Sequence, residues 1–279
     1  MGPWCPKKGF HDSLEFQSRI HPRPIPPPSI YIMRIATWNV NGIRARAAQL
    51  CEWVERDRPE ILCLQELKAE EAQIPTECHF DDYVAYWHGL KGYSGVSLHL
   101  RRDVLAEDVV FSHPDFDIES RMVQAEVGDL LVASVYVPNG GKDYAAKLAF
   151  IQAMIDWVRE HSAARRPLLI LGDMNVARAE IDVHPKERNP RKVGQREEER
   201  ALFQSLLDAG LIDVGREFDP ENENLFTWWA PWRNLRARNI GWRLDYALAS
   251  EDVAERSTSC VVLADIGTSD HAPVMLTLN

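Results

Sequence analysis

The sequence has no long apolar run and few cysteines. No stretch approaches the roughly 18 consecutive apolar residues that a membrane span needs, and no short apolar stretch follows a basic start as in a secretory signal. Five widely spaced cysteines occur, without a CxxC pair: Cys5, Cys51, Cys63, Cys78 and Cys260. This spacing suggests neither a disulfide framework nor a zinc site. We therefore expect free thiols and a cytoplasmic protein, associated with the nucleoid if it is bacterial.

A positive net charge is also missing. The chain has 32 Lys and Arg against 42 Asp and Glu, a net charge of −10 at pH 7. This argues against nucleic acid as a partner, because phosphate binding relies on Lys and Arg. Two segments reverse the balance. Residues 233–243 hold four arginines and no acid beside Trp232 and Trp242, and the second segment holds Lys186, Arg188, Arg191, Lys192 and Arg196. They fit either a phosphate backbone or solvated loop charge.

Residues 1–32 differ from the rest of the chain. They carry Pro22, Pro24, Pro26, Pro27 and Pro28 and show no apolar periodicity, which predicts a disordered or extended tail. One interpretation is that the natural start is Met33. Residues 33–279 contain no further linker, and 45% of the whole sequence is hydrophobic, so we expect one domain with a sizeable core.

From Met33 onward, strand-like and helix-like segments alternate. Helical spacing occurs at 46–56, at 143–161 with Asp143 as N-cap, and at 197–209, ended by Gly210. Apolar strands are predicted at 33–38, 61–64, 96–100, 122–127, 130–137, 168–171, 244–248, 260–263 and 274–278. This order predicts an α/β domain in which helices cover β-sheets.

Lone polar residues fall at or near the ends of these strands. They are Asn39, Asn41, Glu66, Tyr136, Asp173, Asn175, Asp245, Asp270 and His271. Each alone is more often a turn, a cap, an ion-pair partner or a core aromatic. Their joint occurrence favours a site, because sites in sheets flanked by helices are usually built at strand ends.

The residue types indicate the chemistry. Carboxylates and amides without cysteine ligands suit a hard cation, Mg²⁺, for which Mn²⁺ may substitute. Phosphoryl transfer to water needs such a cation, a base for the water and donors to the phosphate oxygens. Glu66 can serve the cation, Asp173 with Asn175 the water, and His271 with Asn39 the phosphate.

Six motifs then occur together in one order. They are TWNVNGIR at 37–44, LQELK at 64–68, YVPNG at 136–140, GDMN at 172–175, GWRLDY at 241–246 and SDHAP at 269–273. From Met33 to Asn279 the chain resembles the exonuclease III and AP endonuclease branch of the endonuclease/exonuclease/phosphatase superfamily, which is DNase I-like. The resemblance implies a four-layer α/β sandwich, two packed mixed β-sheets flanked by helices.

The resemblance also implies an activity: a Mg²⁺-dependent nuclease of base excision repair. It would hydrolyse the phosphodiester 5′ to abasic sites in double-stranded DNA and remove 3′ nucleotides or blocking groups, as a monomer. Three alternatives stay open. They are a 3′–5′ exonuclease and 3′-phosphatase with weak abasic-site cleavage, a sugar- or lipid-phosphate phosphodiesterase, and a non-catalytic RNA-binding regulator of the same fold.

The resemblance further implies residue roles. Glu66 looks like the principal metal ligand, with Asn41 and Asp270 nearby. Asp173 would be the acid/base group and Asn175 would orient the water, and both would also lie at the metal. Asn39 and Tyr136 would hold the site and the phosphate. His271, steadied by Asp245, would donate to the scissile phosphate.

DNA contacts are implied in the same way. Trp228, Trp242 and Leu244 match a small apolar pocket for a flipped-out baseless sugar, which a normal base cannot enter. Lys142 and the pair Trp232 and Arg233 match loops that press into the grooves. In the loop 184–196, Gly194 adds little bulk, so we expect room there for the abasic backbone.

Overall fold

The computed structural model describes residues 1–2, 32–105 and 109–279. The predicted tail, residues 1–32, therefore lies almost entirely outside the described residues, as does Cys5. All helices, strands and turns named below lie within residues 32–105 and 109–279. Within the described part of the chain, no helix has the length and apolar character to cross a membrane.

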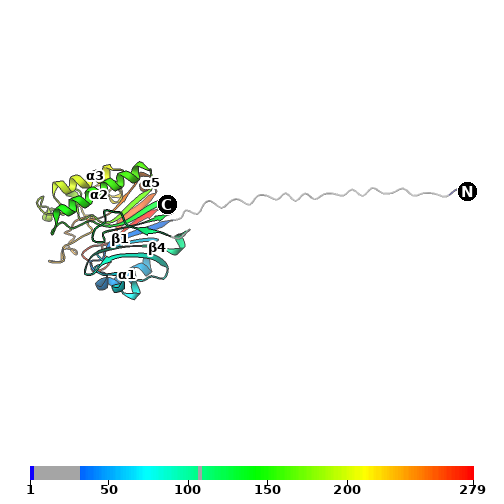
Figure 1. Ribbon diagram of the computed structural model, residues 1–279, viewed down its shortest axis with the longest axis horizontal. Coiled ribbons are helices and arrows are strands. Elements are labelled where there is room, and N and C mark those ends of the chain that lie inside the picture. The colour runs from blue at the N-terminus through cyan, green and yellow to red at the C-terminus, as the bar shows by residue number, and fades with distance from the viewer. Residues whose placement is uncertain (3–31, 106–108) are drawn as a thin grey trace. The chain divides into compact units, whose positions relative to one another are not determined.

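Two six-stranded sheets form the centre of the fold (Figure 1). The first sheet has the order β11 (Ser257–Val262), β12 (Val274–Leu278), β1 (Met33–Asn39), β2 (Ile61–Gln65), β4 (Tyr93–Arg101), β3 (Tyr83–Leu90). The second has the order β5 (Phe111–Ser112), β6 (Met122–Val127), β7 (Leu130–Tyr136), β8 (Leu168–Asp173), β10 (Asp245–Ala249), β9 (Ile212–Asp213).

Each sheet has one parallel pair at its centre. β1 and β2 are joined through α1 (Ile43–Asp57), and β7 and β8 through α2 (Tyr144–Ala163). A helical crossover is the usual connection for parallel neighbours. Every other pairing among the described strands is antiparallel.

Helices cover the outer faces of both sheets. In Figure 1, α2 and α3 (Glu197–Asp208) lie side by side over one sheet, and α1 lies beyond the other. The apolar residues divide accordingly: Ile35, Val132 and Leu171 pack between the sheets, whereas Trp53 of α1 and Ile155 of α2 belong to the two clusters beneath the helices. The predicted four-layer α/β sandwich is confirmed.

Most predicted elements occur within a few residues of their expected bounds. The Asp143 carboxylate accepts the Ala146 N–H at 2.9 Å, which confirms the N-cap of α2. The prediction missed β3, because this strand at the edge of its sheet is half-buried along most of its length and shows no alternation. The short helices α4 (Val214–Phe218) and α5 (Glu251–Glu255) were also missed. Five 3₁₀ turns complete the list: Glu71–Gln73, Thr76–Cys78, Arg102–Val104, Glu180–Asp182 and Pro185–Glu187.

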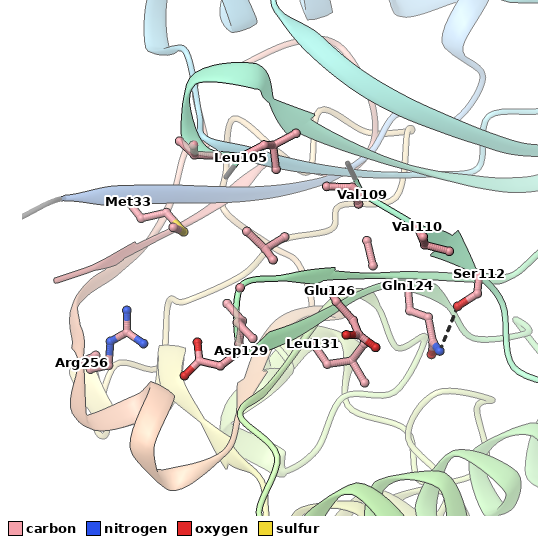
Figure 2. A pocket seen from close by; sticks show the side chains of 15 residues that line it. Met33, Leu105, Val109, Val110, Ser112, Gln124, Glu126, Asp129, Leu131 and Arg256 are labelled. Carbon is pink, nitrogen blue, oxygen red and sulfur yellow. Dashed lines mark hydrogen bonds between the residues drawn. The ribbon is translucent and has the colours of Figure 1, made fainter. Parts of the chain in front are cut away.

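A pocket of about 700 Å³ opens at the amino ends of β1 and β7 (Figure 2). Met33, Leu105 and Leu131 belong to its largely aliphatic lining. It lies at the opposite ends of these strands from Asn39 and Tyr136. This pocket is therefore separate from the polar residues at the carboxyl ends of β1 and β7.

Candidate active site

The carboxyl ends of the two parallel pairs meet at one edge of the sandwich. β1 ends at Asn39, Glu66 directly follows β2, and β7 and β8 end in register at Tyr136 and Asp173. The Asn39 amide connects the two sheets, because its Nδ2 donates to Glu66 Oε1 at 3.1 Å and to Asp173 Oδ2 at 2.9 Å. The parallel topology thus brings together side chains that are 134 residues apart.

Asp173 lies at the centre of this group. Its Oδ1 accepts the Asn175 N–H at 2.8 Å, and its Oδ2 accepts from the Asn175 amide at 3.3 Å. Burial raises the pKa of Asp173 to about 7; the nearby His271 lowers it, and the Asp245 and Glu66 carboxylates raise it. A carboxyl group with a pKa near neutrality can both accept and release a proton.

His271 lies between two carboxylates. Its Nδ1 is 2.8 Å from Asp245 Oδ2, and its Nε2 is 3.8 Å from Asp173 Oδ2. Burial lowers the pKa of His271, but Asp245 and Asp173 outweigh it and raise the pKa to about 10. The ring is therefore an imidazolium at neutral pH, with an N–H available on the side that faces Asp173.

A second chain of contacts runs from Glu66 to Trp228. The Lys68 ammonium lies 2.7 Å from Glu66 Oε2 and donates to Asn41 Oδ1. Asn41 Nδ2 donates to Asp270 Oδ1 at 2.7 Å, and the Trp228 indole donates to Asp270 Oδ2 at 3.0 Å. Burial raises the pKa of Glu66, but its contacts with Lys68 and Asn39 outweigh burial and hold the pKa below its usual value.

Several of these residues have a left-handed backbone. φ is 46° at Asn41, 51° at Glu66, 52° at Lys68 and 52° at Asn175. Such a conformation is uncommon outside glycine and costs about 1 kcal/mol or more. Backbone hydrogen bonds fix it: Lys68 N–H donates to Ser94 O at 2.8 Å, and Gly42 N–H donates to Glu66 O at 2.7 Å. The chain turns sharply where the strands end.

A metal ion has suitable ligands here. Carboxylate oxygens of Glu66 and Asp173 lie within 4.8 Å of each other and of a His271 ring nitrogen. The two carboxylates are the candidate ligands, because a protonated imidazole has no free lone pair for a metal. Asn41 and Asp270 are joined to Glu66 through Lys68, and Asn175 Oδ1 already accepts from the Asn139 amide at 3.1 Å. Most of the donors are carboxylate and amide oxygens, which fits a hard divalent cation.

Three polar residues of the site had no role in the sequence prediction. Lys68 and Asn139 lay inside recognised motifs but without an assignment. The third is Arg121, whose guanidinium lies 4.8 Å from the centre of the Tyr136 ring, although Arg121 is far from any motif. Burial raises the pKa of Tyr136 well above its usual value, with Glu66 and Asp173 adding to the effect. The sequence gives no sign that Arg121 lies at the site, because its position is set by packing against Tyr136.

Trp228, Trp242 and Leu244 form one apolar cluster, as expected. The two indoles meet edge to face at 5.4 Å, and Trp228 lies 6.4 Å from the His271 ring. Only 4% of Trp242 and 5% of Leu244 is exposed. The expectation for Gly194 was wrong: a Cβ there would lie 3.0 Å from the Trp242 ring, so the glycine lets the loop touch Trp242 and leaves no open space.

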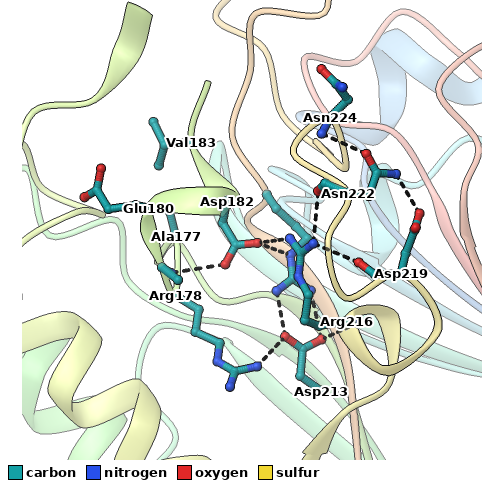
Figure 3. Close-up of polar contacts among 12 residues, drawn as sticks. Ala177, Arg178, Glu180, Asp182, Val183, Asp213, Arg216, Asp219, Asn222 and Asn224 are labelled. Atoms are coloured by element: carbon teal, nitrogen blue, oxygen red, sulfur yellow. Dashed lines mark hydrogen bonds and ion pairs between the residues drawn. The ribbon is translucent and has the colours of Figure 1, made fainter. Parts of the chain in front are cut away.

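The arginine-rich run 233–243 is not one exposed patch. Arg243 is buried and donates to Asp213 at 2.8 and 2.6 Å and to Asp182 at 2.7 Å. Figure 3 shows the same two carboxylates with their further partners Arg178 and Arg216. Arg236 donates to backbone carbonyls, including that of Ser269. Lys142, Trp232 and Arg233 are exposed, as groove contacts require.

The same architecture occurs in solved structures of other proteins. The fold matches an AP endonuclease from Archaeoglobus fulgidus with a TM-score of 0.79 and 30% identity, over 88% of this chain and 99% of that one. It also matches a 3′ phosphatase from Neisseria bound to a product DNA hairpin, with a TM-score of 0.79 and 31% identity over 88% and 99% of the two chains.

Sequence comparison gives the family. An exodeoxyribonuclease of Bacillus subtilis is 32% identical over 88% of this chain and its own full length. The family model described as endonuclease/exonuclease/phosphatase matches residues 36–271. The chain belongs to the endonuclease/exonuclease/phosphatase family.

Proposed function

We propose that this chain is a metal-dependent DNA repair nuclease that hydrolyses the phosphodiester 5′ to abasic sites in double-stranded DNA and removes 3′ nucleotides or 3′ blocking groups. It acts as a monomer through one catalytic domain, residues 33–279. The observation that carries the proposal is geometric: His271 Nε2 lies 3.8 Å from Asp173 Oδ2, and a Glu66 carboxylate oxygen lies within 4.8 Å of ligand atoms of both residues. Exonuclease and AP endonuclease relatives support DNA as the substrate.

The acid and base roles follow from these contacts. Asp173 accepts a proton from the attacking water, which Asn175 orients because its amide is fixed against Asp173. The Nε2–H of His271 donates to a non-bridging phosphate oxygen, and Asp245 keeps the ring protonated and oriented. Tyr136 and Asn39 add donors next to the phosphate.

Glu66 is the first candidate ligand for Mg²⁺ or Mn²⁺, with Asp173, Asn175, Asn41 and Asp270 around it. The bound ion supplies positive charge to the phosphate oxygens. In this arrangement Lys68 holds the Glu66 carboxylate ionised and oriented. Glu66 therefore has a permanent positive partner in the Lys68 ammonium and can also bind an exchangeable metal ion.

The apolar cluster gives the specificity for damage. Trp228 borders His271, and Trp242 and Leu244 lie behind it, so a baseless sugar beside the scissile phosphate would meet indole and aliphatic surface. A sugar that carries a base is too large for such a pocket. Lys142, Trp232 and Arg233 are the candidate groove contacts.

One observation favours a second candidate, an enzyme that acts mainly at 3′ ends. Trp242 and Leu244 are almost fully covered, and the Lys192 ammonium lies 4.5 Å from the centre of a Trp242 ring. A closed pocket admits a flipped-out sugar less readily than an open one, whereas a terminal nucleotide needs no such pocket.

The test is a gel assay of purified protein on a 5′-labelled duplex with one internal abasic site, with Mg²⁺ and with excess EDTA. A single metal-dependent cut immediately 5′ to the site supports the repair endonuclease. A ladder from the 3′ end alone supports the second candidate. Absence of any product on DNA would refute both.

A further inference from the structure

A second group of metal-ligating side chains lies near the end of β3, outside the candidate active site. It consists of His88 on β3 and of His113 and Asp117 between β5 and β6. One ligand atom from each lies within 4.8 Å of the others. His88 Nε2 is 2.6 Å from Asp117 Oδ2, and the two imidazole rings stack with centres 4.8 Å apart and planes 5° from parallel.

The carboxylate of this group is fixed by the backbone. Asp117 Oδ1 accepts the Arg121 N–H at 2.8 Å and the Met122 N–H at 2.9 Å, and only 5% of the Asp117 side chain is exposed. These bonds leave Oδ2 directed to His88. Hydrogen bonds that orient a ligand in this way are a regular feature of metal sites and strengthen metal binding.

The three residues differ in accessibility. His88 is half-buried, whereas His113 is exposed, so the group can be reached from solvent. The ring stacking brings a nitrogen of His113 into the same group as His88 and Asp117, so an ion held by His88 and Asp117 has a third ligand within reach.

We propose that His88, His113 and Asp117 bind a divalent transition-metal ion, with Zn²⁺ as the representative ion. Two imidazole nitrogens and one carboxylate oxygen form a common protein ligand set for Zn²⁺, and they leave a fourth position for water. Mg²⁺ prefers oxygen donors, so it does not compete effectively here. On binding, the ion replaces the hydrogen bond between His88 Nε2 and Asp117 Oδ2, and a neutral His88 ring then carries its one proton on Nδ1.

Occupancy of this site affects the neighbourhood of Tyr136. The ion would tie the segment between β5 and β6 to β3, and Asp117 in that segment holds the backbone of Arg121. The Arg121 guanidinium donates to the Tyr93 hydroxyl at 2.8 Å and lies over the Tyr136 ring. A bound ion thus stabilises the folded chain through mass action, including the part that positions Arg121.

The test compares Zn²⁺ binding by calorimetry in the EDTA-stripped full chain and in His113→Ala. Both proteins keep Glu66, Asp173, His271 and every other histidine, so binding elsewhere is the same in the two titrations. We expect His113→Ala to lose one bound ion, or to bind it at least about tenfold more weakly. The control is His161→Ala, on α2, which should bind Zn²⁺ like the unmodified chain.

A second readout uses Co²⁺ in place of Zn²⁺. A visible absorption band of tetrahedral Co²⁺ should appear in the unmodified chain and in His161→Ala and be absent in His113→Ala. Because the His113 side chain is exposed, its removal should leave the fold intact, which circular dichroism checks. Equal Zn²⁺ binding by the unmodified chain and His113→Ala, or no Zn²⁺ binding by either, overturns the proposal.

Discussion

Two buried polar networks lie next to each other along the chain, one around Arg243 and the other around Asp245 and His271. They differ in how completely their polar atoms are paired. The Arg243 guanidinium makes three hydrogen bonds to Asp213 and Asp182. At Asp245, by contrast, Oδ2 contacts His271, but the buried Oδ1 has no hydrogen-bond partner among the described residues. Buried polar atoms are normally paired, so an unpaired one needs an explanation.

The surplus of carboxylates distinguishes the second network. His271 is one cation, whereas Asp173, Asp245, Glu66 and Asp270 surround it, and the pKa of Asp173 is raised to about 7. A network with this surplus can exchange protons and receive a further cation. In the Arg243 network both carboxylates are paired with arginines, so this network should serve stability alone. The following experiments test this contrast.

The largest expected effect is that of Asp173→Asn. Turnover on abasic-site DNA should fall by about 10³-fold or more, because the variant loses its proton acceptor. DNA binding should change little, since the basic and aromatic contacts remain. Single-turnover cleavage and a binding assay on the same duplex check both statements. Near-normal turnover would remove Asp173 from the assigned role.

Arg243→Met tests the Arg243 network. The variant removes the buried guanidinium, and Asp213 and Asp182 keep only the less buried Arg178 and Arg216 as partners, so the free energy of unfolding should fall by about 3 kcal/mol. Denaturant titration measures it. The control is Arg159→Ala, which removes an exposed ion pair with Asp156 on α2 and should change stability little. Equal effects in the two variants would show that the buried network is not needed for stability.

Trp242→Ala tests the apolar cluster beside the catalytic network. We expect cleavage at abasic sites to fall about tenfold, a loss of about 1.4 kcal/mol in transition-state stabilisation, with a smaller loss in 3′ trimming. Both rates are measured on the same preparation, so any loss of folded protein cancels in their ratio. An unchanged ratio would contradict the pocket assignment.

The smallest expected effect is a pH dependence of stability. Burial raises the pKa of Asp213, but its pairs with Arg243 and Arg178 outweigh burial and hold the pKa below its usual value. The folded pKa is thus below the unfolded value of about 3.9, so this stabilisation is present above about pH 4 and is lost as the pH falls through the folded pKa. Between pH 6 and pH 3, unfolding midpoints should therefore fall more in the unmodified chain than in Asp213→Asn. Parallel curves would show that Asp213 contributes nothing to this dependence.

The sequence predicted the residues of the catalytic network but not those of the Arg243 network. Lone polar residues after apolar strands are visible as a pattern, so Asn39, Glu66 and Asp173 were predicted to lie together, and the structure brings them together. The packing of β1 in one sheet against β8 in the other could not be derived from periodicity, because it depends on contacts between segments far apart in the sequence. The family resemblance supplied the two packed sheets but not the order of their strands.

Other features depended on packing alone. Arg243 was counted as part of a basic patch, because sequence does not show that Asp182 and Asp213, 61 and 30 residues away, neutralise it. Arg121 shows no pattern, since its role comes from the ring of Tyr136. Gly194 was read as open space, whereas an aromatic ring lies against its backbone. Each error concerns a partner distant in sequence.

The position of β1 has a consequence for the synthesis of the chain. β1 pairs with β12, at residues 274–278, and the Ser269 hydroxyl beside the strand end donates to the Asn39 carbonyl at 2.8 Å. During translation, Asn39 and Glu66 therefore emerge long before Asp270 and His271 complete their surroundings. A nascent or prematurely terminated chain without Asp270, His271 and β12 would have no assembled centre, so cleavage has to wait until the last strand leaves the ribosome.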